Sequence, residues 1–204
     1  MSRRRASPRG VPPPGVVLWL TGLSGAGKST ISRGVAAHLR EQAVAHEVLD
    51  GDVVREGLCR DLGFSHEDRD ENVRRIAWVA NLLARNGVSV IVAAISPYAQ
   101  ARREARALVG PAFCEVHVHA SAELCAQRDT KGLYARAHAG EISGLTGVDD
   151  PYQDPVSPDL VVDTANESPE QSVAHVISTL ARHVGALDDA VQASGNSGSP
   201  SPNV

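Results

Sequence analysis

The 204-residue sequence predicts an α/β fold, in which a mostly parallel β-sheet carries helices on both faces. Two observations lead to this prediction. Short apolar runs alternate with segments of helical periodicity from about residue 15 to residue 184, which is typical of parallel sheets. The first apolar run also leads into a glycine-rich stretch with the spacing of a phosphate-binding loop. Together they indicate a three-layer fold of the P-loop NTPase type.

Five apolar runs are the expected strands, and the segments between them are the expected helices. The strands are predicted at residues 15–20, 47–49, 88–94, 113–119 and 160–162. Several of these runs are apolar at consecutive positions, as expected for strands that are buried on both faces. Helices are predicted at residues 28–42, 70–86, 99–109, 122–128 and 170–184. In such sheets ligands bind at the carboxyl ends of the strands, so functional residues are expected just after each strand.

One folded domain with two tails is expected. Residues 1–14 are rich in arginine and proline, lack apolar periodicity and are predicted to form a flexible arm. Residues 188–204 end in small, polar and proline-rich sequence and are predicted to be a disordered tail. The folded domain is therefore expected to occupy residues 15–187.

The composition excludes several classes of function. The net charge is −4, whereas a protein that binds duplex nucleic acid usually shows a basic excess, so no nucleic-acid partner is expected. No apolar run approaches the roughly 20 residues of a membrane-spanning helix, so no membrane partner is expected. The three cysteines are far apart and form no CxxC pair, which favours reduced thiols in a cytoplasmic protein.

Residues 22–29, GLSGAGKS, match the pattern G-x-x-x-x-G-K-[ST] in full. The glycines let the backbone N–H groups converge on phosphate oxygens, and the following helix adds the positive end of its dipole. We expect Lys28 to reach the β- and γ-phosphates, as an exposed loop side chain with little effect on stability, and Ser29 to ligate Mg²⁺. Lys28 is one of only two lysines among 20 Lys and Arg residues. The predicted nucleotide-binding residues are Gly22, Leu23, Ser24, Gly25, Ala26, Gly27, Lys28, Ser29 and Thr30.

Two carboxylates, Asp50 and Asp52, follow the second predicted strand. In an extended segment residues i and i+2 face the same way, so one carboxylate can hold Mg²⁺ while the other accepts the proton of an attacking hydroxyl. This suits a kinase of a small alcohol better than a GTPase. We favour Asp52 as the base and Asp50 as the metal ligand, although the residues alone do not separate the two roles. The alternative is a turn in which an aspartate caps the next helix.

An anionic, planar substrate is suggested by the segment that follows. Arg69 and Asn72 are three residues apart and can share one helical face, and Arg55 and Phe64 precede them. Paired arginines and an aromatic ring suit an anion attached to a flat ring. The alternative is a core phenylalanine among solvated arginines.

Four blocks of the chain resemble adenylyl-sulfate (APS) kinases: LDGDVVREGLCRDLGFSHEDRDENVRR, ISPYAQAR, RDTKGLYARAHAGEI and LTGVDDPY. They occur in order between about Val17 and Thr164. The resemblance implies a P-loop kinase with a five-stranded parallel core and a helical lid, usually dimeric, which converts ATP and adenosine 5′-phosphosulfate into ADP and 3′-phosphoadenosine 5′-phosphosulfate (PAPS). It also implies Mg²⁺ as cofactor and ATP sulfurylase as a functional partner.

The same resemblance assigns roles to individual residues. Arg55, Arg69 and Asn72 would contact the phosphosulfate and sugar of APS, and Phe64 would stack on its adenine. Ile95 would lie close to the acceptor, Ser96 is the family's phosphoserine position, Lys131 would lie near both nucleotides, and Arg128 would lie against the adenine of ATP.

The sequence departs from the family pattern on the acceptor side. Leu145 replaces a phenylalanine that would sandwich the APS adenine, and Ala135 and His138 replace basic lid residues. Two alternatives therefore stay open. One is a kinase of another nucleotide or of a natural-product alcohol, and the other is a weakly active nucleotide-binding subunit of a sulfate-activating complex.

Overall fold

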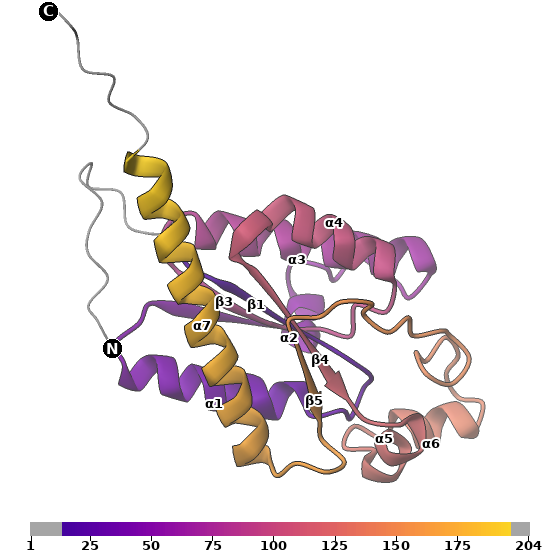
Figure 1. Ribbon diagram of the computed structural model, residues 1–204. Coiled ribbons are helices and arrows are strands. Elements are labelled where there is room, and N and C mark those ends of the chain that lie inside the picture. The colour runs from indigo at the N-terminus through magenta and orange to yellow at the C-terminus, as the bar shows by residue number, and fades with distance from the viewer. Residues whose placement is uncertain (1–13, 197–204) are drawn as a thin grey trace, which may run out of the picture.

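The structure, a computed structural model, describes residues 14–196, with side chains up to residue 189 (Figure 1). Its centre is a five-stranded parallel sheet in the order β2-β3-β1-β4-β5. The strands are β1 (Val17–Thr21), β2 (His46–Asp50), β3 (Ser89–Ala93), β4 (Phe113–His119) and β5 (Leu160–Asp163). The predicted fold class is therefore confirmed, and each strand overlaps the segment predicted for it.

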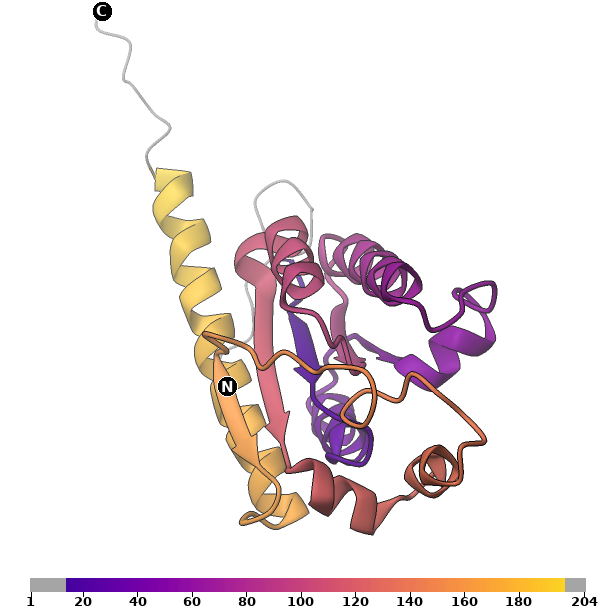
Figure 2. The same cartoon turned by 90° about the vertical axis from the view of Figure 1, so that its right-hand side faces the viewer.

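Helices cover both faces of the sheet (Figures 1 and 2). One face carries α1 (Lys28–Glu41) and α7 (Pro169–Asn196), and the other carries α3 (His66–Ala84) and α4 (Ala99–Val109). The shorter elements are α2 (Gly51–Glu56), α5 (Ala122–Arg128), α6 (Leu133–His138) and a 3₁₀ turn, η1 (Gly110–Ala112). Among the described elements, no helix has the length and apolar character of a membrane span.

Strand β1 shows how the sequence builds two cores from one strand. Leu18 and Leu20 are buried in the apolar cluster beneath α1 and α7. Val17 and Trp19 are buried in the cluster beneath α3 and α4. Because side chains alternate across a strand, an uninterrupted apolar run is what a doubly covered central strand requires.

The helices differ from the prediction mainly at α2, at α6, at the start of α3 and at the end of α7. The two short helices α2 and α6 were not predicted, because six residues are too few for an apolar period to show. Helix α3 begins at His66 instead of residue 70, because the Ser65 hydroxyl caps it by accepting from the Asp68 N–H at 3.1 Å.

Helix α7 continues to Asn196, so residues 188–196 are helical where a disordered tail was predicted. The run DDAVQAS contains neither proline nor glycine, so the preceding turns of α7 propagate through it. The remaining tail, residues 197–204, and residues 1–13 of the predicted arm lie outside the described part of the chain.

Candidate active site

A cleft of about 1100 Å³ lies at the carboxyl ends of the strands. The P-loop lines one side of it, and the segments after β2 and β3 line another. Figure 2 shows α5, α6 and the segment after them (salmon to orange) beyond the same ends of the strands. Of the predicted site residues, only Gly22, Leu23 and Ala26 do not line this cleft. The sequence thus identified residues from six segments that the fold brings together.

The P-loop follows β1 directly and turns into α1 at Gly27, which has a φ of 107°. Gly22 has a φ of 147°, and a Cβ there would lie 2.2 Å from the carbonyl oxygen of Val118. Only glycine fits at Gly22, because any side chain would displace β4. The close approach lets the loop curl over the end of the sheet, with the N-terminus of α1 facing the cleft.

Lys28 is the first residue of α1 and is only 9% exposed, so the expectation of an exposed loop lysine is wrong. Its ammonium group donates to the carbonyl oxygens of Gly22 at 2.9 Å and Leu23 at 2.7 Å. The side chain therefore folds back over the loop and braces it. Burial, together with the nearby positive charge of Lys131, lowers the pKa of Lys28 to about 8.

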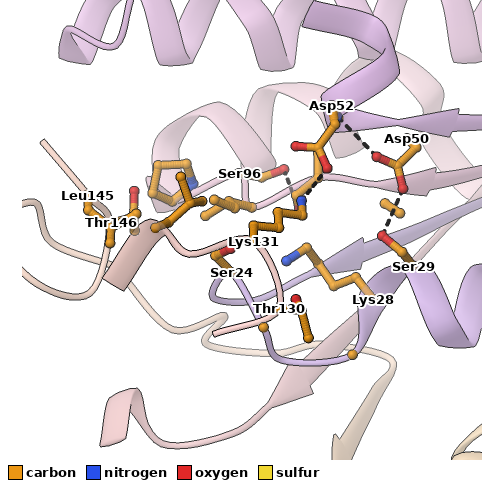
Figure 3. Close-up of a pocket in the computed structure, with 18 of the residues that line it drawn as sticks. Ser24, Lys28, Ser29, Asp50, Asp52, Ser96, Thr130, Lys131, Leu145 and Thr146 are labelled. Atoms are coloured by element: carbon orange, nitrogen blue, oxygen red, sulfur yellow. Dashed lines mark hydrogen bonds and ion pairs between the residues drawn. The ribbon is translucent and has the colours of Figure 1, made fainter. Parts of the chain in front are cut away.

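Asp50 and Ser29 bring two oxygen ligands together. The Ser29 hydroxyl donates to Oδ2 of Asp50 at 2.8 Å, while Oδ1 accepts from the Asp52 N–H at 3.0 Å and caps α2 (Figure 3). The capping alternative is therefore confirmed as a structural role of Asp50. It does not compete with metal binding, since a carboxylate has lone pairs for both. A hydroxyl and a carboxylate beside a phosphate loop are the hard oxygen ligands that Mg²⁺ prefers.

Asp52 lies inside α2, so the expectation of an extended Asp50–Asp52 segment is wrong. The chain turns into the helix at Gly51, yet Asp52 still faces the cleft. Its carboxylate forms an ion pair with Lys131, which lies between α5 and α6 (Figure 3). The Asp52 side chain is 62% exposed, so it is accessible from the cleft. Lys131 thus links the lid segment to the candidate base.

Phe64 is 62% exposed, which excludes the alternative of a core phenylalanine. The guanidinium carbons of Arg55 and Arg69 lie 4.4 and 5.5 Å from the centre of its ring. Such contacts fix the ring and leave part of its surface to the cleft. Asn72, on the same helix as Arg69, is 8% exposed, and its Oδ1 is buried without a hydrogen-bond partner among the described residues. An unsatisfied buried oxygen that lines a cleft is suited to a donor on a ligand.

Residues 143–150, which we call the acceptor-wall loop, line the cleft with their first four residues. The Asp149 carboxylate accepts from the N–H groups of Gly144 at 2.7 Å and Leu145 at 2.6 Å. Leu145 lines the cleft and is otherwise packed into the core below α1. Leu145 was singled out from the sequence, but the roles of Thr146, Asp149 and Asp150 were missed. The two adjacent acids, Asp149 and Asp150, were the signal in the sequence that could have indicated a turn here.

Ser96 follows β3 and is almost fully buried, with a φ of 48°. Its hydroxyl accepts from the indole N–H of Trp19 at 3.1 Å, and its carbonyl oxygen accepts from Arg102 at 2.6 Å. The carbonyl oxygen of the neighbouring Ile95 accepts from Thr21 at 2.6 Å. Ser96 lines the cleft, but its hydroxyl is engaged by the core.

Arg128, at the end of α5, lies at the other end of the cleft. Its guanidinium donates to the carbonyl oxygen of Thr164 at 2.6 Å, to the Thr164 hydroxyl at 3.0 Å and to the carbonyl oxygen of Gly25 at 3.3 Å. Arg128 therefore ties the P-loop to the segment after β5. Thr164, which the sequence did not single out, positions this arginine.

The fold and the cleft define a P-loop kinase: one side of the cleft carries the P-loop, and the other side carries the carboxylate of Asp52 and the ring of Phe64. Residues 14–163 match the sequence model of the adenylylsulphate kinase family. The chain belongs to the adenylyl-sulfate kinase family, which confirms the resemblance found in its motifs.

Individual relatives agree with this placement. The chain is 56% identical to the adenylyl-sulfate kinase of Gloeothece citriformis, over 81% of this chain and 94% of the relative. It is 51% identical to that of Halothermothrix orenii, over 81% and 89%. Among solved structures it is similar to the Mycobacterium tuberculosis APS kinase CysC in complex with AMPPNP and APS, with 47% identity, a TM-score of 0.79, and 83% and 99% coverage. A hexameric APS kinase from Thiobacillus denitrificans is 34% identical with a TM-score of 0.62, over 83% of this chain and 29% of that chain.

Proposed function

We propose that this chain transfers the γ-phosphoryl group of ATP to the 3′-hydroxyl of adenosine 5′-phosphosulfate, giving ADP and PAPS. The observation that carries the proposal is a single cleft lined by the P-loop and, across from it, by Asp52, Phe64, Arg69 and Asn72. The similarity to an APS kinase that was solved with AMPPNP and APS supports both substrates.

The donor side binds the triphosphate of ATP. The P-loop N–H groups and the Lys28 ammonium neutralise the β- and γ-phosphates, and Arg128 lies at the end where the adenine would bind. Ser29 and Asp50 would hold Mg²⁺, which when bound offsets the charge of the phosphate oxygens. Lys28 acts most strongly when negative charge shifts toward the leaving oxygen.

Asp52 is the proposed general base. As the 3′-oxygen of APS forms its bond to the γ-phosphorus, the bond from that phosphorus to the bridging oxygen of ADP breaks, and Asp52 accepts the hydroxyl proton. The carboxylate is paired with Lys131. The phosphates of ATP would compete for Lys131, so donor binding would release Asp52 for its task.

The acceptor side orients APS. Phe64 would stack on the adenine, and Arg55 and Arg69 would balance the two negative charges of the phosphosulfate. The buried Oδ1 of Asn72 would accept a hydrogen bond from the sugar. Ile95 and Leu145 would supply apolar contact beside the adenosine. Ser96 lies next to this site, and its phosphorylation would not be an obligatory step.

The cellular setting is also a proposal. We expect a homodimer that works in the cytoplasm and receives APS from an ATP sulfurylase. One solved relative is described as hexameric, which supports self-association in the family. The measurement is the mass of the purified protein by light scattering, with and without nucleotides.

The proposed reaction is tested by adding APS to the ATP-loaded protein and following ADP. We expect rapid ADP formation with APS and little with adenosine 5′-monophosphate, which lacks the sulfate. ADP formation with another nucleotide or alcohol, but not with APS, would replace this proposal by a kinase of that acceptor. The altered residues Leu145, Ala135 and His138 favour including such acceptors. Tight binding of ATP and APS without turnover would identify a regulatory subunit.

A further inference from the structure

Arg69 is held by the protein itself, although it is expected to bind an anion. It is 7% exposed, and all three of its nitrogens donate to protein oxygens. Nε donates to the carbonyl oxygen of Phe64 at 3.0 Å, Nη1 to the Thr146 hydroxyl at 3.0 Å, and Nη2 to the carbonyl oxygen of Gly144. A guanidinium has five N–H groups, so two remain for a ligand. Its orientation is therefore fixed before the acceptor arrives.

Asp150 is the acid beside this arginine. Its Oδ2 lies 3.7 Å from Nε of Arg69 and accepts from the Thr146 hydroxyl at 3.0 Å. Its Oδ1 accepts from the Tyr98 hydroxyl at 2.7 Å. By charge alone, an acid next to an anion-binding arginine weakens the binding of anions. The contribution of Asp150 must therefore be to orient its neighbours.

Tyr98 connects Asp150 to the first residues of α3 and α4. It is the residue before α4 and is almost fully buried. Its ring stacks on that of His66, the first residue of α3, with centroids 3.7 Å apart and planes 5° apart. Burial and the bond to Asp150 raise the pKa of Tyr98 to about 12, so its hydroxyl keeps its proton at neutral pH and can donate.

The acceptor-wall loop depends on these contacts because it has little regular structure. Its backbone contains a single isolated bridge, between Thr146 and Asp150, and no helix or strand. Side chains from the start of α3 and the start of α4 hold it in place. Neither Tyr98 nor Asp150 lines the cleft, so neither can contact a substrate in this arrangement.

We propose that Tyr98 and Asp150 are positioning residues for the acceptor site, which hold Arg69 and the acceptor-wall loop in the shape that binds APS. This inference rests on the proposed function. According to this inference, an outer layer of residues that do not line the cleft affects the binding of APS and leaves the binding of ATP unchanged. Donor binding depends on different contacts, such as the bond from the Tyr134 hydroxyl to the carbonyl oxygen of Ser24 at 3.0 Å.

The test compares two tyrosines that each lose only a hydroxyl. Tyr98→Phe keeps the ring stacked on His66 and removes the bond to Asp150, so we expect the KM for APS to rise about tenfold and the KM for ATP to change less than about twofold. Tyr134→Phe removes the bond to the P-loop, so we expect the opposite split. Isothermal titration of APS into the ADP-bound proteins measures the same effect without turnover.

A second pair of variants tests the acid. Asp150→Asn should raise the KM for APS at least about tenfold, because an amide has only one acceptor oxygen and so loses the bond from Tyr98 or the bond from Thr146. Asp154→Asn is the matched control, since this side chain is 72% exposed and lies outside the network. It should leave both KM values unchanged. Thermal melting shows whether the Asp150→Asn protein folds. If it does not fold, the KM values of Tyr98→Phe alone test the inference.

Lower melting temperatures with an unchanged KM for APS in Tyr98→Phe and Asp150→Asn would mean a purely structural network and would overturn the inference. Equal rises in the KM for ATP and for APS would overturn it as well. If the wild-type protein neither binds nor phosphorylates APS, the proposed function fails and this inference fails with it. The ADP assay on the wild-type protein therefore separates the two failures.

Discussion

The two sides of the cleft are built in different ways. The centre of the donor side is one short stretch, residues 22–30, whose shape is set by glycine backbone and by Lys28 folded onto the loop carbonyls. The acceptor side gathers side chains from α2, α3, the end of β3, the lid segment and the acceptor-wall loop. A local sequence pattern can specify the first. The second exists only once the sheet and its helices have assembled.

The difference extends to how each side satisfies its polar groups. Lys28 donates to two carbonyl oxygens of the loop, whereas Asn72 on the acceptor side keeps a buried oxygen without a partner among the described residues. The P-loop on the donor side is therefore preorganised by hydrogen bonds within the loop itself. The acceptor side is held by an outer layer, of which Tyr98 and Asp150 are the centre.

The largest expected effect comes from Lys28→Ala. It removes a charge from the phosphates and two hydrogen bonds that brace the loop, so kcat should fall at least about 10³-fold and the KM for ATP should rise. Steady-state kinetics measure both. The only other lysine gives the comparison: Lys131→Ala should lose less, because Lys131 is exposed and lies outside the P-loop. A near-normal kcat in Lys28→Ala would contradict the assignment of the donor side.

Asp52→Asn should lower kcat about 10²-fold with a smaller effect on APS binding, because the carboxylate matters chiefly when the hydroxyl proton moves. Asp50→Asn, the matched substitution at the end of β2, should instead raise the Mg²⁺ concentration needed for activity. Titrations of Mg²⁺ and APS against initial rate distinguish the two. The reverse pattern would exchange the base and the metal ligand.

Stability should rise with pH above about 8 because of Lys28. Burial lowers its pKa to about 8 in the folded protein, below the ordinary lysine value of about 10.4. Between these values the unfolded chain binds the proton and the folded chain does not, so the free energy of unfolding rises by up to about 1.4 kcal/mol per pH unit. Urea unfolding of nucleotide-free wild type should show this gain relative to Lys28→Met. If the free energies of unfolding of the two proteins change with pH in parallel, the lowered pKa of Lys28 is refuted.

Ser96→Ala should act on stability more than on chemistry. Its hydroxyl accepts from the Trp19 indole, so its loss leaves a buried donor unpaired and should cost about 1–3 kcal/mol. We expect kcat to stay above about a tenth of the wild-type value. Trp19→Phe breaks the same bond from the other side, but the smaller ring also leaves a cavity in the core, so its loss of stability should be larger. Complete loss of activity in a folded Ser96→Ala protein that binds ATP would support an obligatory phosphoserine.

The smallest expected effect is a gain. An aromatic ring stacked on a base contributes about 1–3 kcal/mol, so Leu145→Phe should bind APS up to about tenfold more tightly. The acceptor wall then gains the ring that faces Phe64 in the family pattern. Isothermal titration of APS into the ADP-bound proteins measures it. Unchanged affinity would mean that the buried Leu145 side chain, packed into the core, does not reach the adenine.

The contrast between the two sides also explains what could be predicted from the sequence. The P-loop, the strands and the acids after β2 are contiguous patterns, so the fold and the donor side followed from them. Two features did not, because each depends on tertiary contacts. They are the burial of Lys28 and the link between Tyr98 and Asp150 over 52 positions. The helical conformation of residues 188–196 was missed for a different reason, because α7 simply continues into a segment of small and polar residues.

The most direct test of the account uses APS and its 3′-deoxy analogue as acceptors. Both carry the adenine and the phosphosulfate, but only APS has the hydroxyl whose proton Asp52 would accept. We expect both to bind the ADP-loaded protein with similar affinity, and only APS to yield ADP from ATP together with a product that carries a new phosphate on the 3′-oxygen. Equal ADP formation with the 3′-deoxy analogue, or none with APS, would contradict the account.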